Sequence, residues 1–201
     1  MVYQSGQVKS IFPYVHPGIK HFVLGGPADG DEAQVFHEEF PDVSIHGFEP
    51  NQGFFDYQLS HDFPGSLRQA ALAEAPGKLP FYIMGEKEGR SSRLVASHTP
   101  AYEVDVVTID SLGLNEPTVL WLDIERAELR ALQGASRMLS HGLIDVVLLE
   151  VLPDTETPVV QFLRQYNIFE VERVNVHGRY DDAGRDEDYR YDGIYRRIGA
   201  P

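Results

Sequence analysis

The sequence predicts an α/β fold with a mostly parallel sheet and helices on both faces, and two observations carry that prediction. Short apolar runs alternate with stretches of helical period along most of the 201 residues. The apolar runs are continuous, which is typical of parallel strands buried on both faces. The length fits one domain. We divide it into an N-terminal extension (residues 1–20), a core (21–150) and a C-terminal part that completes the sheet (151–201).

Strands are predicted where apolar and β-branched residues run together. His21–Gly25 (HFVLG) opens into a glycine-containing turn, and Ile144–Glu150 (IDVVLLE) gives the strongest strand pattern in the chain. The full set of predicted strands is His21–Gly25, Val43–Phe48, Leu67–Leu72, Leu79–Met84, Glu103–Ile109, Val119–Asp123, Ile144–Glu150, Ile168–Val176 and Tyr189–Arg197.

Helices are predicted where apolar residues recur every three or four positions. One such stripe, Ala127, Leu129, Leu132 and Leu139, follows the strand Val119–Asp123 and indicates a long helix. The predicted helices are Asp31–Phe40, Asn51–Asp62, Glu125–Leu139 and Thr157–Tyr166.

Composition excludes several classes of protein. The chain has 31 acidic and 17 basic residues, a net charge of −14, so we expect neither a nucleic-acid partner nor a membrane partner. It has no cysteine and therefore no disulfide, thiolate nucleophile or cysteine-bound zinc. No run of about 18 apolar residues and no signal-peptide pattern is present, so we expect a cytoplasmic protein. The sequence is also compatible with a homodimer.

A ligand site is expected at the carboxyl ends of the strands, where open parallel sheets bind their ligands. Gly26 and Gly30 flank the turn after the first strand, and Glu49 ends the next strand about 20 residues later. Such an acid accepts hydrogen bonds from an adenosine ribose. The strand end at Ala71 and Leu72 adds two expected contacts. The glycines also fit a plain turn, and Glu49 also fits a surface position before a proline.

Acidic residues in the glycine turn favour one kind of nucleotide cofactor. Asp29, Asp31 and Glu32 crowd a helix N-terminus that would otherwise bind a pyrophosphate. Negative charge there repels a dinucleotide and suits a cationic ligand, so we expect S-adenosylmethionine, with Asp29 among its contacts. The same acids also fit simple compensation of the helix dipole. A nicotinamide-dependent oxidoreductase is therefore retained as the alternative.

A set of motifs resembles the FkbM family of S-adenosylmethionine-dependent methyltransferases. The motifs are G-x-x-x-G at Gly26–Gly30, GFEPN at Gly47–Asn51, TIDSL at Thr108–Leu112, LWLDIERAEL at Leu120–Leu129 and VLLE at Val147–Glu150. The resemblance implies the class I methyltransferase fold, Rossmann-like, with seven strands of which the last is antiparallel. It also implies transfer of a methyl group to oxygen, on a hydroxyl of a sugar or natural-product small molecule.

The resemblance assigns residues to the site. Gly26 and Gly30 match the family's cofactor loop, Glu49 its ribose-binding acid, and Asn51 follows in the same turn. Asp123, Glu125 and Glu128 match its D-x-E-G-A-E stretch.

Three positions depart from the family pattern. Leu24 replaces an Asp, Arg126 replaces a Gly beside the reacting centre, and Trp121, where Lys is frequent, is expected to pack in the core. A catalytically weak, cofactor-binding module is a second alternative that Leu24 and Arg126 keep open.

Catalysis is expected at the end of the strand Val119–Asp123. Transfer to an alcohol requires a base for the hydroxyl proton, and Asp123 and Glu125 are predicted to orient the acceptor and remove that proton. His177 is the alternative base, and Glu125 also fits a helix cap. Glu150 and Arg126 are predicted on the acceptor side. Glu150 and Asp123 have the oxygen ligands that a divalent metal takes, but we expect no metal.

Overall fold

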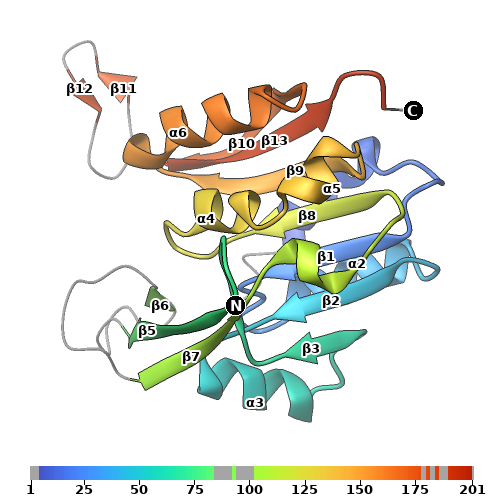
Figure 1. Cartoon of the computed structure of the whole chain (residues 1–201). Coiled ribbons are helices and arrows are strands. Elements are labelled where there is room, and N and C mark those ends of the chain that lie inside the picture. The colour runs from blue at the N-terminus through green and yellow to red at the C-terminus, as the bar shows by residue number, and fades with distance from the viewer. Residues whose placement is uncertain are drawn as a thin grey trace.

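A seven-stranded sheet forms the centre of the computed structural model, which describes residues 5–83, 92–93, 102–177, 180–181, 184–185 and 190–200. Its strands are β1 (His21–Gly25), β2 (Ser44–Phe48), β3 (Ser66–Arg68), β8 (Thr118–Leu122), β9 (Ile144–Val151), β10 (Ile168–His177) and β13 (Arg190–Arg197). Their order is β10-β13-β9-β8-β1-β2-β3 (Figure 1). The last strand, β13, runs antiparallel to both of its neighbours, and the other pairs are parallel. The predicted fold is confirmed.

Helices cover both faces of this sheet because its strands are apolar on both sides. The helical segments are α1 (Ser5–Ile11), η1 (Phe12–Tyr14), α2 (Asp31–Glu39), α3 (Gln52–Ser60), η3 (Ile109–Leu112), α4 (Glu128–Gln133), α5 (Ser136–Ser140) and α6 (Pro153–Arg164). On one face, α1 and α2 pack on Phe22, Leu24 and Trp121, so Trp121 is a core residue as predicted. On the other face, α4, α5 and α6 pack on alternate residues such as Val23 and Leu120.

A smaller sheet stands beside the main one, and it corrects one predicted strand. It comprises β4 (Ala71–Leu72), β7 (Tyr102–Val107), β5 (Gly77–Ile83) and β6 (Ser92–Arg93), in that order. The predicted strand Leu67–Leu72 is therefore two strands, β3 and β4, in different sheets. The β5–β7 pair is antiparallel. A short hairpin of β11 (Tyr180–Asp181) and β12 (Gly184–Arg185) precedes β13.

The single helix predicted over Glu125–Leu139 is wrong in its start and in its continuity. Glu125 and Arg126 adopt left-handed backbone angles, φ +52° and +77°, so α4 begins only at Glu128. The break between α4 and α5 lies at Gly134, where an added Cβ would stand 2.2 Å from the Ala73 carbonyl oxygen. The Asp110 carboxylate then accepts the Arg137 and Met138 amides at the start of α5, at 2.7 and 3.0 Å. The apolar stripe survives across this break, which is why the sequence suggested one helix.

Helices long and apolar enough to traverse a bilayer are absent from the part of the chain that the structure describes.

Gly26 is required for more than its backbone angle. Its φ is +77°, and an added Cβ would lie 2.1 Å from the Asp123 carbonyl oxygen. Gly113 has nearly the same angle, φ +70°, but nothing lies within 4 Å of an added Cβ. We expect Gly113→Ala to cost about 1–2 kcal/mol through the left-handed backbone alone, and Gly26→Ala to cost clearly more because the backbone must move. Urea unfolding of both variants measures this difference. Equal losses would show that the Gly26–Asp123 contact is unimportant.

Candidate functional site

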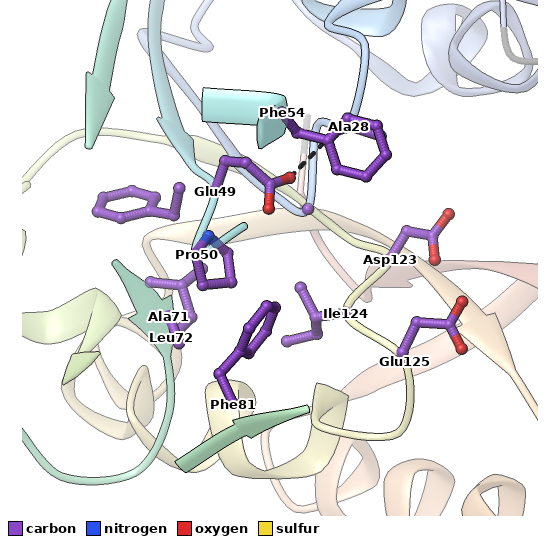
Figure 2. A pocket seen from close by; sticks show the side chains of 12 residues that line it. Ala28, Glu49, Pro50, Phe54, Ala71, Leu72, Phe81, Asp123, Ile124 and Glu125 are labelled. Carbon is purple, nitrogen blue, oxygen red and sulfur yellow. Dashed lines mark hydrogen bonds between the residues drawn. The ribbon is translucent and has the colours of Figure 1, made fainter. Parts of the chain in front are cut away.

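A cleft of about 520 Å³ lies at the carboxyl ends of β1, β2 and β8, beside the small sheet. Figure 2 shows its side chains, with Glu49 on one side and Asp123 and Glu125 on the other. The residues that line it are Gly26, Ala28, Phe48, Glu49, Pro50, Phe54, Ala71, Leu72, Phe81, Asp123, Ile124 and Glu125. Six of the predicted site residues therefore share one cleft, and they are Gly26, Glu49, Ala71, Leu72, Asp123 and Glu125.

Glu49 is buried, at 4% exposure, and the backbone amides of two loops hold its carboxylate. Oε1 accepts the Asn51 amide at 2.7 Å and Oε2 accepts the Ala28 amide at 3.2 Å. Burial raises the pKa of Glu49 to about 7, and the two amide hydrogen bonds oppose that rise. These bonds fix the carboxylate and leave each oxygen a further lone pair for a ligand hydroxyl.

The glycine turn is only partly a wall of this cleft. Gly26 and Ala28 line it, and the Gln58 side-chain amide anchors the turn by donating to the Ala28 carbonyl at 2.6 Å. Asp29 and Gly30, both predicted cofactor contacts, instead line a separate hollow with Tyr57 and Gln58. Gly30 precedes α2 with φ +83°, a left-handed backbone angle that favours glycine, so its role there is conformational.

Carboxylates cluster at the other end of the cleft. One oxygen each of Asp123, Glu125 and Glu150 lies within 4.8 Å of the others. Burial, followed by the charges of Glu150, Glu125 and Asp192, raises the pKa of Asp123 well above its usual range. The cluster therefore favours a proton or a cationic group between its members at neutral pH.

Glu128 supports the loop that carries this cluster. Its Oε1 accepts the backbone amides of Ile124 and Arg126, both at 3.2 Å. The side chain is 1% exposed, and burial raises its pKa to about 8, with the charge of Glu150 contributing. Glu128 therefore holds this loop through its backbone amides. Glu125 does not cap α4, because Ala127 occupies that position.

Three other predicted residues do not line the cleft wall. Asn51 caps α3 by accepting the Gly53 and Phe54 amides. Arg126 pairs with Asp154 at the start of α6. Glu150 belongs to the carboxylate cluster and lies 3.6 Å from Arg190, but the cleft wall does not include it.

His177 ends β10, opposite Arg190 of β13 in the register, and its side chain falls outside the described part of the structure.

Sequence reasoning missed several residues of the cleft. Phe81 belongs to β5 of the small sheet and lies outside all of the family motifs, so no local pattern indicates it. Ile124 and Phe54 read as ordinary helix or core residues. Ala28 had a usable signal, because it lies between the two glycines of the turn that Glu49 was expected to face.

The family of the chain follows from a comparison with family models. The model described as the methyltransferase FkbM domain matches residues 26–173. The chain belongs to the FkbM methyltransferase family. That match spans the cleft from the glycine turn to the carboxylate cluster and favours methyl transfer over the nicotinamide-dependent alternative. A comparison with curated proteins finds no significant match.

Solved structures support the fold of this FkbM domain. A precorrin-6y C5,15-methyltransferase from Geobacter metallireducens GS-15 is 12% identical with a TM-score of 0.54, over 98% of this chain and 91% of that one. EvdMO1 is 11% identical with a TM-score of 0.53, over 96% and 40%. An rRNA-methylase candidate from Clostridium thermocellum is 10% identical with a TM-score of 0.52, over 100% and 99%. At these identities the likeness concerns the fold alone.

The raised pKa of Glu128 predicts a pH dependence of stability. The folded protein holds the Glu128 proton up to about pH 8, whereas the unfolded chain releases it near pH 4.5. Between these values the folded state binds more protons, so unfolding free energy falls as pH rises, on the order of 1 kcal/mol per pH unit. We expect Glu128→Gln, which keeps an acceptor oxygen, to flatten this slope in urea unfolding between pH 5 and 8. Exposed Glu38→Gln is the control, and an unchanged slope in Glu128→Gln would contradict the assignment.

Proposed function

We propose that this chain is an S-adenosylmethionine-dependent methyltransferase that methylates a hydroxyl of a small molecule, a sugar or natural product. One observation carries the proposal: a buried, amide-held carboxylate and a cluster of carboxylates stand at opposite ends of one cleft (Figure 2). When bound, S-adenosylmethionine supplies an activated methyl group on a positively charged sulfonium.

The Glu49 end of the cleft fits the nucleoside part of this cofactor. Glu49 can accept both ribose hydroxyls, because its two oxygens are fixed by the Ala28 and Asn51 amides. Ala71, Leu72 and Phe81 provide apolar walls for a flat base.

The carboxylate end fits the acceptor and the reacting centre. A carboxylate next to a sulfonium is electrostatically favourable, and Asp123 and Glu125 supply that negative charge. With its raised pKa, Asp123 takes up a hydroxyl proton more readily than an ordinary carboxylate does. Glu150 is the third acceptor of hydrogen bonds there. In this proposal Asp123 is the base, and Glu125 and Glu150 orient the alcohol.

The charge of the chain favours a small-molecule acceptor over RNA. A net charge of −14 opposes binding of a phosphate backbone, and the cleft adds carboxylates at the reacting end. Catalysed methyl transfer to a panel of sugars, macrocyclic alcohols and RNA separates these acceptor classes.

Cofactor affinity depends on Glu49 in this proposal. Glu49→Gln loses charge-assisted hydrogen bonds to the ribose, so we expect the affinity for S-adenosylhomocysteine to fall on the order of 10²-fold. Calorimetric titration of S-adenosylhomocysteine and of NAD into the wild type and the variant measures both affinities. Exposed Glu39→Gln is the control. Unchanged binding in Glu49→Gln, or tighter binding of NAD than of S-adenosylhomocysteine, would contradict the assignment of Glu49 to the ribose of S-adenosylmethionine.

Turnover depends on Asp123. Asp123→Asn removes the base, so we expect the turnover number to fall by about 10²–10⁴, with a much smaller change in cofactor affinity. The rise of activity with pH that accompanies ionisation of Asp123 disappears in this variant. Glu125→Gln should lower turnover less, and stability should stay near that of the wild type because Glu125 caps no helix. Full activity of Asp123→Asn with loss in His177→Ala would transfer the role to His177, and full activity in both variants would mean catalysis by positioning alone.

A further inference from the structure

Two histidines face each other on the neighbouring strands β1 and β2, near the amino end of β1 and away from the cleft at its carboxyl end. His21 Nδ1 and His46 Nε2 are 3.3 Å apart, and the two ring centres are 5.3 Å apart. The outer nitrogen of His21 lies 3.5 Å from the Glu116 carboxylate, and the outer nitrogen of His46 lies 3.1 Å from the Ser66 hydroxyl. All four residues belong to one row of polar side chains.

The parallel register brings this row together. His46 of β2 is level with Val23 of β1 and with Ser66 of β3. His21 lies two residues before Val23, so it projects from the same face of the sheet as His46, one step along the diagonal. Glu116 precedes β8, on the other side of β1, and reaches His21 from there.

The spacing of the inner nitrogens matches a shared metal ion. Two nitrogen ligands at ~2.0–2.1 Å from a tetrahedral zinc ion are ~3.3 Å apart, the separation found here between His21 Nδ1 and His46 Nε2. A carboxylate on the outer nitrogen is the usual support for a metal-bound histidine. Glu116 provides this support for His21.

The surrounding groups allow both inner nitrogens to present lone pairs. Without metal, the Ser66 hydroxyl can donate to His46 Nδ1, and His46 Nε2 can then donate to His21 Nδ1. The Ser66 hydroxyl can instead donate to the Ile45 carbonyl, at 3.3 Å, and its oxygen can then accept a hydrogen bond from a protonated His46 Nδ1. In that tautomer His46 Nε2 carries no proton, and its lone pair is available to a metal ion. Burial and the neighbouring His21 lower the pKa of His46, a direction that favours the neutral ring to which a metal ion binds.

We propose that His21 and His46 form a binding site for a late first-row divalent cation, with Zn²⁺ as the representative ion. The two imidazoles supply two ligands, and water completes the coordination. When the ion binds, the His46 ring changes tautomer, with its proton on Nδ1 instead of Nε2. The site is independent of the methyl-transfer cleft and uses none of its residues.

Titration calorimetry with Zn²⁺, on the full chain purified without a histidine tag, tests the site. We expect one Zn²⁺ per chain in the wild type, at least a tenfold loss of affinity in His21→Gln and in His46→Gln, and no comparable response to Mg²⁺. Glu116→Gln should lower affinity by about 10- to 100-fold, the usual effect of removing a supporting carboxylate. Exposed His61→Gln is the matched control.

The carboxylate cluster is a competing cation site, so Asp123→Asn is titrated as well and should bind Zn²⁺ as the wild type does. Histidine-selected nitrogen NMR of the wild type avoids any folding defect of the variants. It should show Zn²⁺ shifting His21 Nδ1 and His46 Nε2 before other nitrogens. Zinc binding that survives His46→Gln, disappears in Asp123→Asn, or leaves these two nitrogens unshifted would overturn the proposal.

Discussion

The close approach of Gly26 to Asp123 is the contact on which the cleft depends. The Gly26 amide donates to the Phe48 carbonyl of β2, and the Asp123 amide donates to the Gly25 carbonyl of β1. These bonds join the carboxyl ends of three adjacent strands, and the bare Cα of Gly26 lets the loop after β8 pass directly over it. Because β2 and β8 flank β1 on opposite sides, Glu49 and Asp123 stand across one cleft and not in separate ones.

Burying carboxylates along this cleft costs stability, and the backbone offsets part of that cost. Glu49 and Glu128 are each almost fully buried, and each accepts two backbone amides. Their pKa values nevertheless rise to about 7 and 8, so the amides do not compensate for lost hydration. Carboxylates that cost folding free energy in this way are typical of functional sites. The protein tolerates them because they shape the two ends of the cleft.

Local patterns predicted most strands, and they failed where distant contacts decide the structure. β1, β8 and β9 lie within a residue or two of their predicted bounds because continuous apolar runs leave little choice. The helix over Glu125–Leu139 was wrong because its break depends on Ala73 and Asp110, which come from other parts of the chain.

The candidate site divides in the same way. Glu49 and Asp123 could be found from their places at strand ends, where a carboxylate next to apolar residues stands out. Phe81 could not, because its position depends on how the small sheet packs against the main one. Asp29 and Gly30 were expected in the cleft because they belong to the glycine turn, yet the turn directs them into another hollow.

The loop between β8 and α4 explains how this chain keeps an arginine where its family has glycine. Glu125 and Arg126 both hold left-handed backbone angles, each at a cost of about 1–2 kcal/mol for residues with a Cβ. Glu128 accepts the Arg126 amide, and the Arg126 side chain pairs with Asp154 on α6, so contacts at both ends of the residue offset the strain. The same conformation turns Glu125 toward the cleft beside Asp123 (Figure 2). The backbone reversal at Glu125 and Arg126 brings the second carboxylate to the cleft, and the contacts of Arg126 with Glu128 and Asp154 hold that reversal.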